Sequence, residues 1–210
     1  MTSYYGIFKN KFNKTLVYYP CPKNGNSSVK LFLVKQLKIE NNFIFLSDKI
    51  SESAHKESDF MGKKNLVNFL PSKQPFQKIN ADIKCCIIRD PVKRFLSAYK
   101  NRVLFHKDKE FNGNSIDQIL EKLENNLFEN KHFLPQSFFL GNDINYYSFY
   151  TDLNKIKIFQ DKVNDFFGNK IVFPQIQTGG NKFEINLSNL QVNKIKEIYK
   201  KDYEMINKKN

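Results

Sequence analysis

Residues 22–28 combine a lysine, a glycine and two hydroxyl side chains in a pattern that suits anion binding. The segment reads PKNGNSS and lies between an apolar run, residues 16–19, and a stretch with helical spacing. A glycine turn before a helix presents backbone N–H groups and the helix dipole to an anion, and Lys23 adds a point charge. The segment lacks the Gly-Lys-Ser/Thr ending of nucleoside triphosphatases. It predicts a phosphate-type site of another kind, with an ordinary turn as the alternative.

A second candidate segment holds all the arginines of the chain. Arg89, Arg94 and Arg102 lie within fourteen residues, whereas lysine is abundant throughout. The planar guanidinium suits bidentate contacts to phosphate or carboxylate. Arg94 and Ser97 share one face of a predicted helix, and we expect Arg89 and Ser97 to converge on a second anion. The alternatives are a solvated Arg94 and a Ser97 that only packs. Two neighbouring anion sites favour a ligand with two separated phosphate groups.

Strands and helices alternate along the chain, which predicts a three-layer α/β fold with a P-loop-like central parallel β-sheet flanked by helices. Asp90 and Pro91 are typical of an N-cap and a first helical residue. Short apolar runs predict strands at residues 16–19, 42–46, 83–88 and 170–173. Apolar residues at helical spacing predict helices at residues 27–37, 91–103, 115–128, 152–167 and 188–206. Ligands of such sheets bind at the carboxyl ends of the strands, where both candidate segments would lie.

Length and composition set further expectations. We expect one domain, residues 1–210, with the irregular polar stretch 47–80 as a lid or substrate-binding insertion. The net charge of +13 suits nucleic acid, a membrane surface or anionic ligands, but the lysines are dispersed. Cys21, Cys85 and Cys86 are predicted to be buried free thiols. The sequence shows no signal peptide and no long apolar run, so we expect a cytoplasmic protein without a stable membrane anchor. Nothing in the pattern predicts an oligomeric state.

Several motifs, in the same order along the chain, resemble those of a known enzyme family. YYPCPKNGNSS resembles the 5′-phosphosulfate loop of the sulfotransferases that use 3′-phosphoadenosine 5′-phosphosulfate (PAPS), and RDPVKRFLSAY resembles their 3′-phosphate motif. His132-Phe-Leu-Pro-Gln136 is similar to the His-x-x-Pro-Gln element of the Golgi-type carbohydrate group, known as sulfotransferase family 2. Asn181-Lys182 and residues 195–203 resemble the last segment of that group. The resemblance runs from about Thr15 to Tyr203.

The resemblance implies a role for each matching position. The residues implied on the 5′-phosphosulfate are Lys23, Asn24, Gly25, Asn26, Ser27 and Ser28. Arg89 and Ser97 are implied on the 3′-phosphate, and Asn181 and Lys182 in a loop that closes over the nucleotide.

The chain departs from the family pattern at two points. Asn26 stands where the family usually has threonine or cysteine. The glutamate that usually follows the His-x-x-Pro-Gln element is missing near Tyr150 and Thr151. The second departure leaves substrate contacts in that region unassigned.

The implied reaction is in-line transfer of a sulfuryl group to a hydroxyl or amine, with Lys23 stabilising the charge that grows on the leaving phosphate. A general base should take the acceptor proton, and histidine is best matched to neutral pH. His132 is the first candidate, and His55 the second, because some carbohydrate sulfotransferases place their base upstream of the arginine motif. His106 is expected to be solvated. The carboxylates left open as alternatives are Glu52, Glu57 and Asp59.

The resemblance also implies partners. PAPS would be the donor, adenosine 3′,5′-bisphosphate the product, and a glycan or another hydroxyl-bearing molecule the acceptor; the sequence shows no metal-ligand spacing, so no metal is expected. One rival is a P-loop-like kinase or nucleotide-binding enzyme, although no convincing Mg²⁺-binding aspartate follows an apolar strand. Another is a non-catalytic module for nucleic acid or an anionic ligand. Most phenylalanines occupy core-like positions rather than basic surface stretches, so nucleic acid is not expected.

Overall fold

The protein is built around a five-stranded mixed β-sheet with strand order β3-β1-β2-β4-β5. The computed structural model describes residues 3–38, 67–72, 76–125, 130–175 and 183–208. The strands are β1 (Ser3–Lys9), β2 (Thr15–Tyr19), β3 (Val67–Ser72), β4 (Ile83–Ile88) and β5 (Phe149–Asp152). β2, β4 and β5 are parallel, whereas β1 is antiparallel to both of its neighbours. The carboxyl ends of β2 and β4 therefore lie side by side at one edge of the sheet.

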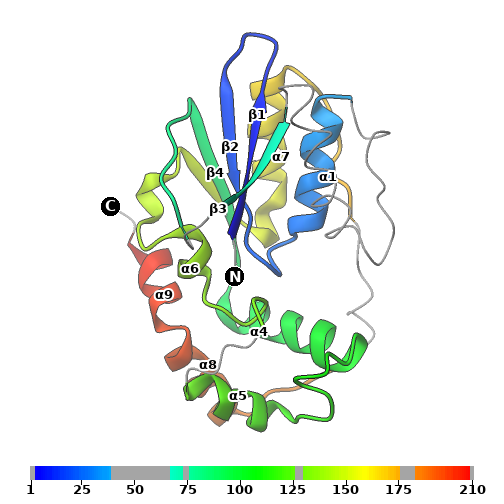
Figure 1. Cartoon of the computed structure of the whole chain (residues 1–210), viewed down its shortest axis with the longest axis vertical. Coiled ribbons are helices and arrows are strands. Elements are labelled where there is room, and N and C mark those ends of the chain that lie inside the picture. Colours follow the sequence, from blue (N-terminus) through cyan, green and yellow to red (C-terminus); the bar gives the residue numbers. More distant parts are fainter. Residues whose placement is uncertain (1–2, 39–66, 73–75, 126–129, 176–182, 209–210) are drawn as a thin grey trace.

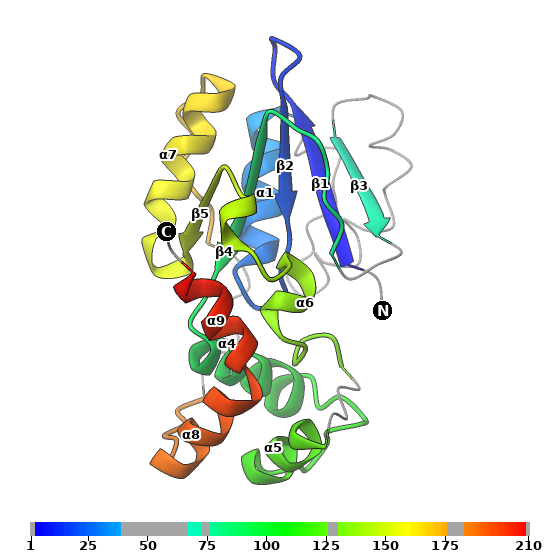
Figure 2. The same cartoon turned by 90° about the vertical axis from the view of Figure 1, so that its left-hand side faces the viewer.

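Helices cover both faces of the sheet and extend beyond one end of it (Figures 1 and 2). The α-helices of the described part are α1 (Asn26–Gln36), α4 (Pro91–Ala98), α5 (Ile116–Glu124), α6 (Gln136–Leu140), α7 (Ile156–Phe167), α8 (Asn189–Ile198) and α9 (Lys200–Asn207). α4 continues as the π-helical η2 (Tyr99–Phe105), and short 3₁₀ turns form η3 (Ile144–Tyr146) and η4 (Leu153–Lys155). No helix in these ranges is long and apolar enough to cross a membrane.

Alternation along the strands divides the core into two layers. Tyr18 and Cys85 pack toward α1 and α7, while Tyr19 and Cys86 pack toward α6 and α9. A third apolar cluster joins α4, η2, α5 and α8 beyond the end of the sheet. This arrangement confirms the α/β class and the helices on both faces. The three cysteines are buried and free, as predicted.

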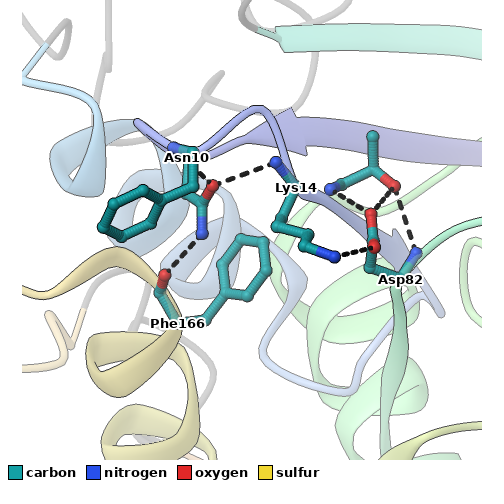
Figure 3. Close-up of polar contacts among 6 residues, drawn as sticks. Asn10, Lys14, Asp82 and Phe166 are labelled. Carbon is teal, nitrogen blue, oxygen red and sulfur yellow. Dashed lines mark hydrogen bonds and ion pairs between the residues drawn. The ribbon is translucent and has the colours of Figure 1, made fainter.

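Two polar side chains, Asn10 and Asp82, tie the β1–β2 hairpin to helix α7 and to the start of β4 (Figure 3). Asn10 donates from Nδ2 to the carbonyl of Phe166 at the end of α7, over 2.9 Å. Asp82, just before β4, accepts from the backbone N–H and the hydroxyl of Thr15 at 2.8 and 2.9 Å and pairs with Lys14 at 3.2 Å. These contacts align the starts of β2 and β4, and therefore also their functional ends.

The predicted elements around both candidate segments are confirmed. Strand 83–88 has the predicted bounds. The prediction at 16–19 differs from β2 by one residue at its start, and the prediction at 27–37 differs from α1 by one residue at each end. Asp90 caps α4 by accepting from the backbone N–H of Lys93, and Pro91 opens the helix.

Three predictions elsewhere are wrong. Residues 170–173 form no strand, because the backbone N–H groups of Ile171 and Phe173 donate to side chains of α7 instead of to a strand. Phe149–Asp152 is the strand, so the helix predicted from residue 152 begins at Ile156. The helix predicted at 188–206 divides at Tyr199 into α8 and α9.

Two further strands were not predicted, and two other predictions are covered by the described residues only in part or not at all. The antiparallel β1 was not predicted, and it makes the sheet mixed rather than wholly parallel. β3 lies inside the stretch predicted to be irregular. The helix predicted at 115–128 is seen as α5, which ends at Glu124. The strand predicted at 42–46 lies outside the described residues.

Candidate active site

The loop between β2 and α1 forms a turn that opens directly onto the helix. Lys23 and Gly25 have φ values of 70° and 73°, in the left-handed region. A side chain at Gly25 would also meet Leu153, since an added Cβ would lie 2.8 Å from its Cδ1. Gly25 is the N-cap of α1, and the first turn of this helix contains no acidic residue. The N-terminal amides of α1 thus face an end without negative charge, which suits an anion.

Gln136 joins this loop to the end of β4. Asn24, which is fully buried, donates from Nδ2 to the carbonyl of Ile87 and to Oε1 of Gln136, both at 2.7 Å. The same Oε1 accepts from the backbone N–H of Arg89 at 3.0 Å, and Nε2 of Gln136 donates to the Arg89 carbonyl at 2.8 Å. One amide side chain therefore holds the two predicted anion-binding segments in a single arrangement. The side chain of Asn24 thus acts inside the protein, and its backbone N–H donates to the Cys21 carbonyl at 3.3 Å, so both groups serve the turn itself.

Gln136 is itself held by the C-terminal helix α9. Asp202 is 0% exposed and accepts from the backbone N–H groups of Gln136 and Ser137, each at 2.8 Å. A carboxylate at these amides satisfies donors that the first turn of α6 leaves without an intrahelical partner. Through these two contacts α9 holds the site in position, although Asp202 itself is buried and does not line it.

Arg89 and Arg94, two arginines of the second segment, bind carbonyl groups of the first. Arg89 donates from Nη1 to the carbonyl of Lys23 at 2.8 Å. Arg94 donates from Nε to the carbonyl of Pro22 at 3.0 Å and from Nη2 to that of His132 at 3.4 Å. Arg94 is 1% exposed, so the alternative of a solvated helix residue is wrong. Ser97, on the same helix, is half-buried, and its hydroxyl bonds to none of the residues that the structure describes.

Positive charge accumulates around Lys23 and His132. Burial, together with Arg102, Arg89 and Arg94, lowers the pKa of Lys23 to about 7. Burial also lowers the pKa of His132 to about 2, with further contributions from Arg102, Lys23, Lys131 and Arg94. Both pKa values fall for the same reason: the charged form of each side chain would be buried away from water and would lie near several other cations. Such a place favours a multiply charged anion.

His132 is hydrogen-bonded on one side of its ring. Its Nδ1 lies 2.6 Å from Oδ1 of Asn130, and the same oxygen accepts from the backbone N–H of His132 at 3.0 Å. Asn130 in turn donates from Nδ2 to Asp108 and Glu110, both at 3.0 Å. His132 therefore belongs to a chain of polar side chains that includes Asn130, Asp108 and Glu110.

The remaining predicted residues are not gathered here. His106 is exposed at the end of η2, as expected. His55, Asn181, Lys182 and the alternative carboxylates Glu52, Glu57 and Asp59 lie outside the described residues.

The structure also adds residues that the sequence did not single out for a role: Gln136, Asp202, Asn130 and Asp108. Gln136 stands in a recognisable motif, and Asn130 lies two residues before His132. Their positions in the sequence could therefore have drawn attention to them, but not their roles. Asp202 lies in the segment 195–203, which was also singled out from the sequence, but nothing in that segment shows that its partners are backbone groups 65 and 66 residues away.

Comparison with known proteins agrees with this geometry. A family model described as "Sulfotransferase family" matches residues 8–208. No curated protein and no solved structure matches the chain.

Proposed function

The chain belongs to the sulfotransferase family, an enzyme family whose sulfuryl donor is PAPS, and from this premise we propose how its own residues carry out the transfer. The acceptor that we propose is a hydroxyl group of a carbohydrate. The observation that carries the proposal is the junction of the β2–α1 loop with the end of β4. There the N-terminus of α1 lies close to Lys23 and the arginines that lower its pKa. This is the chemistry that a nucleotide with phosphate groups at both ends requires.

The proposed donor contacts follow from that junction. The 5′-phosphosulfate is held by Lys23 and by the backbone at the start of α1, with Ser27 and Ser28 adding hydroxyl groups. The 3′-phosphate is held by Arg89 and Ser97. A side chain at Gly25 would strain the left-handed backbone of the turn and collide with Leu153, so glycine allows the turn that precedes these amides. Contacts from Asn181 and Lys182 are part of the proposal and rest on the motif alone.

In the proposed reaction the acceptor oxygen attacks sulfur in line with the bond to the 5′-phosphate. The new S–O bond forms as the bond to the phosphate oxygen breaks, and the phosphate leaves with the electron pair. Lys23 stabilises the charge on that leaving group, which is the main electrostatic task in such transfers. The protein otherwise contributes position, because both reactants must lie within van der Waals distance and in line.

We assign the general base to His132, which takes the acceptor proton. Burial, together with the cations around it, keeps the imidazole unprotonated at neutral pH, which is the form a base needs. Both also make it a weak base, and an anion would compensate the part that comes from the cations. A bound donor would bring that negative charge, so donor binding and base strength are coupled in this proposal. His55 remains the alternative base. A cytoplasmic location remains a prediction from the sequence.

The test is a thermal-shift titration with adenosine 3′,5′-bisphosphate, compared with 5′-AMP, ADP and ATP with Mg²⁺. A ligand at about a hundred times its Kd stabilises a protein by about 2.7 kcal/mol. We expect a shift with the bisphosphate alone, reduced in Arg89→Ala and unchanged in Lys14→Ala, an exposed control far from the site. A larger shift with ATP and Mg²⁺ would contradict the proposal. Transfer of ³⁵S from labelled PAPS to the members of a panel of glycans then identifies the acceptor class.

A further inference from the structure

The side chain of Asn130 has a single possible orientation. Its Nδ2 lies 3.0 Å from Oδ2 of Asp108 and 3.0 Å from Oε1 of Glu110. Ionised carboxylates only accept hydrogen bonds, so the amide nitrogen must face them and the amide oxygen must face His132. The hydrogen bond from Asn130 also lowers the pKa of Glu110, which keeps that carboxylate ionised.

Asp108 is fixed in turn by Arg102. The guanidinium binds the carboxylate with two bonds, Nε to Oδ2 at 2.5 Å and Nη2 to Oδ1 at 2.7 Å. The backbone N–H of Asp108 also donates to the Arg102 carbonyl at 2.9 Å. A bidentate pair with a backbone bond holds the carboxylate in position and in direction. The chain Arg102–Asp108–Asn130–His132 thus begins on η2 and ends at the imidazole.

This orientation determines the tautomer of His132. Oδ1 of Asn130 can only accept, and it lies 2.6 Å from Nδ1, so Nδ1 carries the hydrogen. In the neutral ring the free electron pair then belongs to Nε2. The other tautomer would place two acceptors against each other at Nδ1.

We propose that Asn130 is a positioning residue that holds His132 in the Nδ1–H tautomer, so that Nε2 is ready to take the acceptor proton. This inference rests on the proposed function, in which His132 is the base. Asp108 and Glu110 act through Asn130 and do not touch the ring. An amide at this place fixes the tautomer without adding negative charge beside the imidazole. Besides burial, the groups that lower the pKa of His132 are the cations Arg102, Lys23, Lys131 and Arg94.

The first test is the tautomer itself. ¹⁵N-labelled protein in complex with adenosine 3′,5′-bisphosphate is examined by long-range ¹H–¹⁵N NMR, in which protonated and free ring nitrogens have well separated shifts. We expect His132 to show a protonated Nδ1 and a free Nε2 in the wild type, and a mixture of tautomers in Asn130→Ala. A protonated Nε2 in the wild type would overturn the inference, whatever the activity of the enzyme.

The second test is kinetic. Asn130→Ala should lower kcat by about tenfold, less than the about hundredfold or more that loss of a general base costs, with the KM for PAPS unchanged. Asn145→Ala, an exposed asparagine distant from the site, is the matched control and should keep full activity. Glu110→Ala removes one anchor of Asn130 at an exposed position, whereas glutamine would keep an acceptor oxygen there. The alanine variant should lower kcat by a few-fold, which provides a test even if Asn130→Ala does not fold.

The outcomes separate the inference from the function on which it rests. Full activity of a folded Asn130→Ala, together with an inactive His132→Ala, would overturn the role of Asn130 and leave His132 as the base. Full activity of His132→Ala would overturn the base assignment, while the NMR spectrum would still decide whether Asn130 holds the ring.

Discussion

The two sides of the candidate site are built differently. On the donor side, Asn24, Gln136 and Asp202 are completely buried and most of their hydrogen bonds go to backbone groups. On the side of His132, Asn130 and Glu110 bond to one another through side chains near the surface. Buried backbone-directed contacts open only with large parts of the fold, whereas exposed side-chain contacts can open locally. We therefore expect the donor side to open only together with large parts of the fold, and the contact of Asn130 with Glu110 to tolerate change without unfolding the protein.

The two sides nevertheless share their cations. Lys23 and Arg94 lower the pKa of His132, although both belong to the donor side. Variants on the donor side should therefore change stability or donor affinity, while variants on the base side should change turnover. The following predictions test that division, beginning with the largest effect.

Loss of Asp202 should be the most destabilising change. Asp202→Ala leaves two buried backbone N–H groups without their acceptor, at about 1–3 kcal/mol for each unsatisfied group. We expect the free energy of unfolding in urea to fall by about 3 kcal/mol, with weaker donor binding as a result. Asp143→Ala, which removes an exposed cap of η3, should cost less than about 1 kcal/mol. Equal effects of the two variants would mean that α9 does not support the site.

Loss of His132 should act on turnover alone. His132→Ala is expected to lower kcat at least about a hundredfold, the usual contribution of a general base, and to leave the affinity for adenosine 3′,5′-bisphosphate nearly unchanged. Single-turnover assays with ³⁵S-labelled PAPS measure the first quantity and calorimetry the second. A much smaller loss would return the role to His55 or to a carboxylate.

Donor binding should take up a proton at Lys23. In the free protein the pKa of Lys23 is lowered to about 7, and a bound phosphate favours the ammonium form. Affinity should consequently fall as pH rises above 7, by at most about tenfold per pH unit. Calorimetry at pH 8 in two buffers of different ionisation enthalpy measures the proton uptake directly. Lys23→Arg is the matched control, because arginine stays charged and should lose this part of the pH dependence.

The smallest effect is expected far from the site, at the β1–β2 hairpin. Hydrogen bonds from the backbone and hydroxyl of Thr15, together with Lys14, lower the pKa of Asp82 to about 2. A depressed folded-state pKa stabilises the protein above the unfolded pKa of about 4, and this contribution is lost as pH falls toward 2. Asp82→Asn should therefore be less stable than the wild type at pH 6, with the difference shrinking at pH 3 in urea unfolding. Donor binding at neutral pH should not change.

Much of the donor side could be predicted from the sequence, because its signals are local. An apolar run, a glycine turn and helical spacing identified β2, the loop and α1, and Asp90-Pro91 marked the start of α4. Capping and periodicity act between residues a few positions apart, so they leave a readable pattern. The arginines were also recognised from their scarcity, although the burial of Arg94 was not.

Other features required the folded chain. Residues 149–152 and 170–173 are both short, partly apolar segments. Only their tertiary partners distinguish them: residues 149–152 pair with the open edge of β4, whereas residues 170–173 are hydrogen-bonded to α7. Gln136 and Asp202 stand in segments that resemble family motifs, and Asn130 lies just before one of them, but nothing in these segments shows what the three side chains bind. Their roles arise from partners brought together by packing, across 66 residues in one case and 22 in another. Local propensity determines which elements form, but the pairing of strands and the partners of buried polar groups depend on which surfaces meet, and that information is spread over the whole chain.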